Sequence, residues 1–210
     1  MLGQSTIIAV VLITGIVIAL TGAAYIWSAP LLEKSTSLST LQTATTFILN
    51  VNEGIIDIAN QQGGERTFDI PTGAVTVIRY DPSSLDPDNI LRYEFTVSQP
   101  LVEGGGITYL GDTSFADTFG EQVGIFPDSR PSILSMRGEA IGRDYKMIIE
   151  DLFRARKTLT APIQQFQIVL NKDFGGSQAG TSSVTIRYDT TEPLDTIPPT
   201  TLTLIRIIVA

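Results

Sequence analysis

The sequence predicts an α+β protein in which a long N-terminal hydrophobic α-helix precedes an all-β globular head with an immunoglobulin-like or sandwich architecture. Charge is the first observation behind this prediction, because the first 32 of the 210 residues carry no charged side chain. Periodicity is the second: apolar residues recur at helical spacing to about residue 60, and afterwards they alternate with period two. Clusters of Gly, Pro and Asp between the alternating segments are the third.

The N-terminal segment 7–27 contains 21 residues without a charge or a proline. About 20 apolar residues at ~1.5 Å each span a hydrocarbon layer of ~30 Å. Three interpretations follow: a cleaved secretory signal, a plain membrane anchor, or a helix that later becomes the core of a polymer. The run is longer than a usual signal core of about 7–15 residues, and no Lys or Arg precedes it, which disfavours the first interpretation.

Small residues form a stripe along this segment. Gly15, Ala19 and Ala23 lie four residues apart, and Gly22 follows Gly15 after seven. Such a stripe lets helix backbones approach one another closely. We therefore expect helix–helix packing through a set of apolar and small residues: Ile7, Ile8, Val11, Leu12, Gly15, Ile18, Ala19, Gly22, Ala23 and Ile26.

The helical rhythm continues beyond this apolar segment to about residue 62. Its apolar stripe is one-sided and is expected to pack on the head; it comprises Leu31, Leu38, Leu41, Thr45, Ile48, Asn52, Ile55 and Ala59. Pro30 is expected to kink this stem, and Gly63-Gly64 to end it. The predicted organisation is a stem over 1–62 and a head over 65–210.

The neck between these parts is rich in hydroxyl groups, since eight of the twelve residues 35–46 are Ser or Thr. A solvated helix face explains this composition, and O-glycosylation of an exposed neck is the alternative. The candidate acceptors are Ser35, Thr36, Ser37, Ser39 and Thr40.

Ten strands are expected in the head. They cover 66–70, 74–80, 90–98, 107–110, 122–126, 133–137, 145–150, 163–170, 183–188 and 201–209. Segment 151–157 fits either a helical turn or an irregular strand. The last strand is apolar on both faces, so we expect it to lie in the middle of a sheet, or to be covered by the stem or a neighbouring molecule.

Composition excludes several functions. The chain has no His and no Cys, so it lacks imidazole bases, thiol nucleophiles and the usual zinc ligands. A net charge of −8 argues against binding nucleic acid. The loop with Asp81, Asp86 and Asp88 lacks the Gly and final Glu of an EF-hand, and turn chemistry explains it without calcium. We expect neither an enzyme nor a cofactor.

Residues Gly3-Gln4-Ser5-Thr6-Ile7, with the uncharged segment up to Trp27 and the β-rich head, resemble archaeal type IV pilin-like proteins that are processed through a class III signal peptide. Two features depart from that family: Met1-Leu2 carry no basic residue, and Ile8 stands where an acidic residue is often found. The resemblance covers residues 3–60.

The resemblance implies a processing site at Gly3 and Gln4, a class III signal peptidase that cuts there, and assembly of many copies into a helical homopolymer. It implies stems bundled in the filament core and heads on its surface, after insertion in the cell membrane. A pilus assembly ATPase and a membrane platform would drive that step. The expected product is an extracellular adhesion filament at the cell surface. The alternatives are an archaellin of a swimming filament and a single-span, membrane-anchored binding protein.

Overall fold

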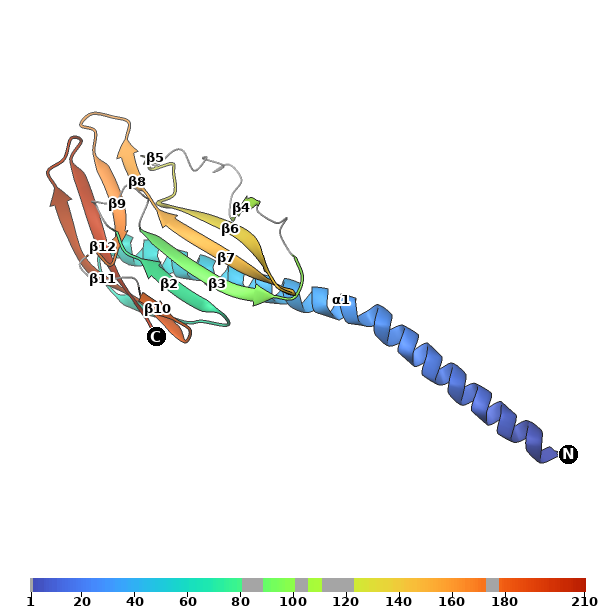
Figure 1. Ribbon diagram of the computed structural model, residues 1–210. Coiled ribbons are helices and arrows are strands. Elements are labelled where there is room, and N and C mark those ends of the chain that lie inside the picture. The colour runs from blue at the N-terminus through green and yellow to red at the C-terminus, as the bar shows by residue number, and fades with distance from the viewer. Residues whose placement is uncertain (1, 81–88, 101–105, 111–122, 173–177) are drawn as a thin grey trace.

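The computed structural model describes residues 2–80, 89–100, 106–110, 123–172 and 178–210, with side chains from residue 8 onward (Figure 1). One long helix, α1 (Leu2–Gln61), precedes a head of two β-sheets. The helix leaves the head at one end, and its N-terminus lies far from every strand (Figure 1). The predicted α+β class with a sandwich-like head is therefore confirmed.

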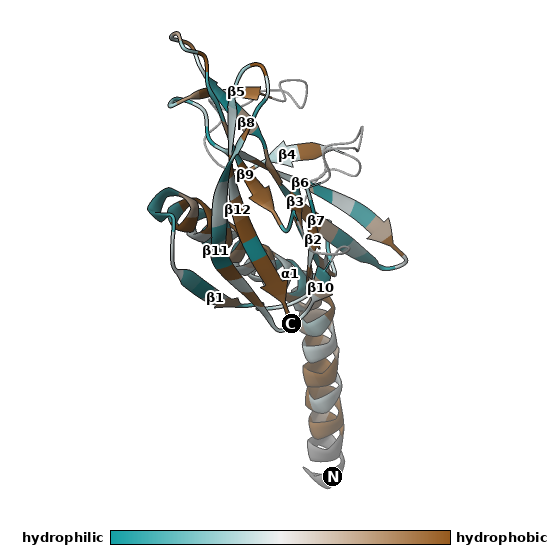
Figure 2. Ribbon diagram, turned by 90° about the vertical axis from the view of Figure 1, so that its left-hand side faces the viewer, coloured by the Kyte–Doolittle hydropathy of each residue, from teal (hydrophilic) through white to brown (hydrophobic). Residues whose placement is uncertain are grey.

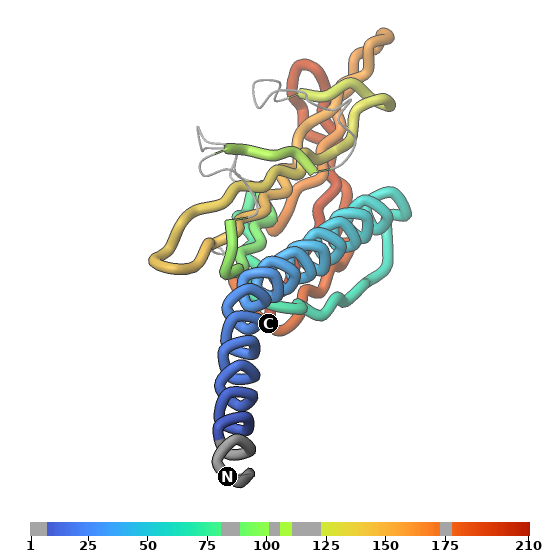
Figure 3. The backbone as a smooth tube through the Cα atoms, turned by 90° about the vertical axis from the view of Figure 1, so that its right-hand side faces the viewer, coloured from blue at the N-terminus to red at the C-terminus, as the bar shows by residue number. Residues whose placement is uncertain are grey.

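Helix α1 is a single helix of 60 residues, and Pro30 lies inside it without interrupting it. A proline in a helix removes the backbone N–H that would bond four residues back, here to the Ile26 carbonyl. The projecting half is brown to pale in the hydropathy colouring, whereas most teal residues lie on the head (Figure 2). The helix axis changes direction between the projecting half and the half that lies along the head (Figure 3).

The C-terminal end of α1 is a left-handed cap. Gln62 has φ 51° and Gly64 has φ 98°, and the Gly63 N–H donates to the Ile58 carbonyl at 3.4 Å. A residue in the left-handed region, followed by an N–H that donates to the helical carbonyl five residues before it, is the Schellman arrangement. The chain then reverses into the first strand.

The strands form two sheets of six. Sheet A has the order β1-β11-β12-β9-β8-β5, and sheet B the order β10-β2-β3-β7-β6-β4. Sheet A contains β1 (Glu65–Asp69), β5 (Val123–Phe126), β8 (Ala155–Thr158), β9 (Gln165–Leu170), β11 (Ser183–Leu194) and β12 (Thr200–Val209). Sheet B contains β2 (Ala74–Ile78), β3 (Ile90–Val97), β4 (Ile107–Tyr109), β6 (Ser132–Ile141), β7 (Asp144–Phe153) and β10 (Gln178–Gly180).

Strand direction differs between the two sheets. All pairs in sheet B are antiparallel, whereas in sheet A β12 runs parallel to β9 and β5 runs parallel to β8. The mixed pairing of sheet A differs from the purely antiparallel sheets of an immunoglobulin domain.

The second half of α1 packs into the head and shares its core. Both sheets and the helix contribute to one hydrophobic cluster, as the amphipathic pattern predicted. The buried apolar residues of the helix are Ala44, Phe47, Ile48, Val51, Ile55, Ile58 and Ala59. The predicted stripe begins too early, because Leu31 and Leu38 are exposed; packing on the head starts at Ser37, one turn before Leu41.

Strand β12 lies inside sheet A, between β11 and β9, as its two apolar faces predicted. Ile205 and Ile207 belong to the main core with α1. On the other face, Leu202 and Leu204 pack with Val169 and Tyr80 in a smaller cluster. Both expectations for the apolar end are confirmed: the strand is central, and one of its faces contributes to the core that contains the stem.

Asn89 ties the two sheets together at a position of positive φ (94°). Its Nδ2 donates to the carbonyls of Phe153 on β7 and Ile168 on β9, at 2.9 and 2.8 Å. Its Oδ1 accepts from the Leu170 N–H at 2.8 Å. Asparagine tolerates the left-handed region better than most residues, and here its amide bonds two backbone carbonyls and one backbone N–H.

All ten expected strands are present, with boundaries that shift by a few residues. The undecided segment 151–157 is extended: it forms the end of β7 and most of β8. The short strand β10 was not expected, because its Gln-Ala-Gly sequence carries no alternation.

Candidate functional site

The most unusual surface of the molecule is the part of α1 outside the head, which we call the apolar rod (Ile8–Leu32). Its large apolar side chains are between 54% and 77% exposed. These are Ile8, Val10, Val11, Leu12, Ile13, Ile16, Val17, Ile18, Leu20, Tyr25, Ile26, Trp27, Leu31 and Leu32. Monomeric soluble proteins rarely expose one contiguous apolar surface of this kind, so the rod is built to be covered.

The rod also has the length and composition of a membrane span. From Ile8 to Trp27 it measures ~30 Å, which matches the hydrocarbon layer of a bilayer. Its hydroxyl groups are satisfied internally: Thr14 Oγ1 donates to the Val10 carbonyl and Thr21 Oγ1 to the Val17 carbonyl, both at 2.8 Å. These two hydroxyl groups therefore need no water.

The end of the rod that faces the head carries the features of a boundary between lipid and water. Tyr25 and Trp27 are exposed there. Aromatic residues of this kind concentrate at membrane interfaces. Glu33 and Lys34 follow as the first charges, and the Gln99 amide donates to Glu33 Oε2 at 3.2 Å.

The small residues of the rod face open space. Apart from the chain neighbours and the adjacent helix backbone, no atom lies within 4 Å of the position that a Cβ would take on Gly15 or Gly22. The predicted packing residues from Ile8 to Ile26 are all exposed, so they do not pack within the subunit. Gly3, Gln4 and Ile7 lie in the first two turns of α1, where side chains are not described.

The structure of the neck rules out one of the five candidate glycosylation sites. Ser37 is 2% exposed, and its Oγ lies 3.3 Å from Ser98 Oγ on the head, so its hydroxyl is not accessible for modification. Ser35, Thr36 and Ser39 are exposed and Thr40 is half-buried, and O-glycosylation at these four positions stays a prediction.

A buried polar cluster fixes the stem to the head. Asn52 Nδ2 on α1 donates to Asp151 Oδ2 on β7 and to Ser132 Oγ on β6, both at 2.6 Å. Asp151 is fully buried between Leu91 and Leu134 of the flanking strands. Burial raises the pKa of Asp151 to about 7, against the smaller opposite effect of the bonds from Asn52 and Ser132.

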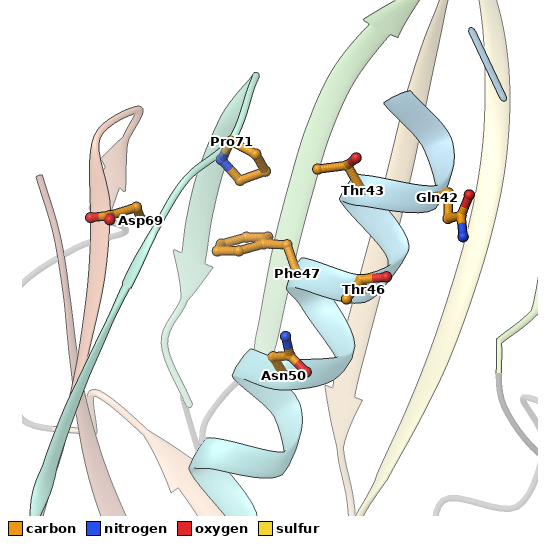
Figure 4. A pocket seen from close by; sticks show the side chains of 7 residues that line it. All are labelled: Gln42, Thr43, Thr46, Phe47, Asn50, Asp69 and Pro71. Carbon is orange, nitrogen blue, oxygen red and sulfur yellow. The ribbon is translucent and has the colours of Figure 1, made fainter. Parts of the chain in front are cut away.

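A shallow groove of about 440 Å³ runs beside the helix. Its lining residues are Gln42, Thr43, Thr46, Phe47 and Asn50 of α1, with Asp69 and Pro71 after it. The Phe47 ring extends from the helix toward Pro71 (Figure 4). Asp69 is the one ionisable group among these seven residues, so the groove lacks the pair of groups that general acid–base chemistry needs.

Metal binding finds no support in the described part of the chain, where no three His, Cys, Asp or Glu side chains gather. The loop carboxylates Asp81, Asp86 and Asp88 lie outside the described residues.

The chain matches no family model, and no curated protein and no solved structure is significantly similar to it.

Sequence reasoning missed the cluster of Asn52, Ser132 and Asp151. One signal was present, because Asn52 interrupts an apolar helical stripe, and a polar residue on a buried face requires a buried partner. The partner itself could not be identified, since Asp151 lies 99 residues further along the chain.

Proposed function

We propose that this chain is a pilin, the structural subunit of an archaeal type IV pilus-like extracellular filament that attaches cells to surfaces. The observation that carries the proposal is the apolar rod, which projects uncovered from a folded head and is apolar on every side. A membrane anchor needs such a surface only while it lies in lipid. Once the rod leaves the membrane, its apolar surface has to be covered by the rods of other copies of the chain.

The energetics favour polymerisation once the rod is outside lipid. Covering about 1,500 Å² of apolar surface at about 25 cal/mol per Å² contributes tens of kcal/mol before the entropy cost of association. A helical filament forms when one subunit contacts the next through two different surfaces and the contacts do not close into a ring. The rods would fill the core and the heads would form the outer layer.

The proposed pathway has three stages. The rod is first inserted in the cell membrane, with the head outside. A class III signal peptidase then cuts near Gly3 and Gln4. Finally, an assembly ATPase on a membrane platform extracts subunits into the growing filament, because moving an apolar rod out of lipid requires work.

The test is microscopy of surface material from cells that make this chain. Negative-stain images are expected to show filaments of uniform width, and mass spectrometry of those filaments is expected to identify this chain with a mature N-terminus at Gln4. A strain without the gene is the control. Dispersed single molecules that need detergent, with no filaments under any growth condition, would refute the proposal.

The single-span alternative rests on Tyr25 and Trp27, which lie where a membrane interface would meet the rod. It predicts a chain that stays in membranes and never appears in sheared surface fractions. The behaviour of a deletion strain distinguishes an archaellin from an adhesion pilin. Deleting the gene of an archaellin would abolish swimming, whereas deleting the gene of an adhesion pilin would reduce attachment to surfaces.

A further inference from the structure

A second cavity, separate from the groove and from the rod, opens where α1 ends above sheet A. It measures about 200 Å³. Sheet A continues from β12 and β9 to β8 and β5, which lie beyond the C-terminal end of α1 in the ribbon (Figure 1). The lining residues are Ala59, Asn60, Gln62, Phe126, Arg156, Phe166, Gln167, Ile168, Thr201 and Thr203.

Arg156 is the only charged residue among those that line the cavity. Its guanidinium lies over the Phe126 ring, 5.1 Å from the centroid, and its Nη1 donates to the Ser129 carbonyl at a long 3.4 Å. Its Nε is buried and finds no acceptor, and no carboxylate of the described residues forms an ion pair with it. Burial, together with the charge of Arg154, lowers the pKa of Arg156.

A half-buried guanidinium without a carboxylate partner is energetically unfavourable by itself, because desolvation weakens its hydration and no ion pair replaces it. A bound anion would accept from the terminal nitrogens of Arg156, for which the described structure shows one long hydrogen bond, from Nη1 to the Ser129 carbonyl. Arginine is suited to that role, since its planar fork binds carboxylates with two parallel bonds.

The rest of the lining is suited to a hydroxylated body with an apolar face. Phe126 and Phe166 form a pair with centroids 5.1 Å apart. The side chains of Asn60, Gln62, Gln167, Thr201 and Thr203 provide amide and hydroxyl groups that both donate and accept. Sites for drug-sized ligands usually measure about 300–1,000 Å³, so this smaller cavity admits one small unit.

We propose that this cavity binds a hexuronate unit of an acidic polysaccharide, with the carboxylate on Arg156, the hydroxyls on the threonine and amide groups, and the carbon face of the ring against the phenylalanines. The proposal goes beyond filament formation, because it assigns the head a ligand. It does not depend on polymerisation, so it can be tested on dispersed subunits.

The experiment uses the full chain in detergent micelles and saturation-transfer NMR at constant ionic strength. The probes are sodium glucuronate, glucose and inorganic phosphate. We expect saturable binding of glucuronate, with affinities for glucose and phosphate at least tenfold weaker. Arg156→Gln is expected to weaken glucuronate binding at least tenfold, and Phe166→Leu to weaken it severalfold.

The matched control is Arg143→Gln, which removes an exposed arginine from the turn between β6 and β7 and should leave binding unchanged. The thermal midpoint of each variant shows whether the head is folded. If glucose bound as tightly as glucuronate, Arg156 would not recognise the carboxylate. If phosphate bound as tightly as glucuronate, the cavity would not recognise the sugar ring. Unchanged binding in a folded Arg156→Gln chain, or no saturable binding by the wild type, would refute the site.

Discussion

Buried polar side chains decide how this molecule holds together, and Asp151 is the most consequential of them. Its Oδ2 accepts from Asn52, whereas its Oδ1 has no partner in the described structure. A carboxylate with one unsatisfied oxygen in an apolar setting is stable in the protonated form, which accounts for the direction of its pKa shift.

The raised pKa of Asp151 predicts that this residue's contribution to the stability of the head decreases as the pH rises. The unfolded state releases this proton near pH 3.8, and the folded state near 7. The contribution to stability is thus fully present below pH 3.8, falls as the pH rises, and is lost above about 7. Three pH units correspond to a loss on the order of 4 kcal/mol.

Asp151→Asn should remove this dependence, because an amide keeps the acceptor for Asn52 without a charge. Thermal midpoints measured from pH 4 to 8 are expected to fall with pH in the wild type and to stay nearly flat in the variant. Asp144→Asn removes a charge from the exposed first residue of β7 and should keep the wild-type slope. Parallel slopes in Asp151→Asn and the wild type would contradict the assignment.

Single residues were also the least predictable part of the molecule. Asn89 joins the sheets through partners 64 to 81 residues away, and the sequence around it resembles an ordinary Asp/Asn-rich turn. Arg156 stands in a segment whose structure could not be decided. Neither position has a local signal, because the contacts that define their roles come from the tertiary fold.

At the scale of elements, α1 consists of two halves with different tasks. The second half is amphipathic, and its buried face could be predicted because helical spacing alone selects it. The rod could be predicted from its lack of charge. What periodicity could not show is that Leu31 and Leu38 lie outside the head, since their spacing continues the buried stripe.

Strands were predictable where apolar and polar residues alternate, and uncertain elsewhere. β10 was missed because three residues, Gln178–Gly180, carry no pattern. The order of the strands and the parallel pairs of sheet A could not be predicted for a different reason. Alternation shows which face of a strand is buried, but it does not identify the neighbouring strand.

The stripe of small residues on the rod allows a test of whether the rod forms the core of a filament or only anchors the chain in a membrane. The Cβ of Gly15→Leu has open space outside the helix backbone, and leucine favours the helix, so the change should leave the subunit folded and inserted. In a bundle of rods the same side chain would force neighbouring backbones apart. We expect at least a tenfold loss of filaments in sheared surface fractions, with unchanged amounts in the membrane.

Ile13→Leu serves as the control, because it keeps the volume and the apolar character of an exposed rod position. Normal filament yield from Gly15→Leu cells would mean that the rods do not pack closely at this stripe.

At the scale of the whole molecule, the head is complete only with the second half of α1. A chain of residues 31–210 keeps every helix residue of the core and loses most of the rod. We expect it to sediment as a monomer without detergent and to unfold cooperatively.

A chain of residues 63–210 loses Phe47, Ile48, Val51, Ile55 and Ile58 from the core. At about 2 kcal/mol for each, the loss is roughly 10 kcal/mol, comparable with the whole net stability of a domain. Circular dichroism is expected to show no cooperative transition. A stable, monomeric 63–210 chain would mean that the sheets form an independent domain.

The unbroken course of α1 has a mechanical consequence. Tension along a filament would act on the rods, and each rod continues without a loop into the middle of its own head. No slack linker exists between them to stretch first, so the pull would reach Ile48 and Asn52 directly. The force needed to pull the helix out of its head would then depend on the contacts inside the core of the head and not on contacts at its surface.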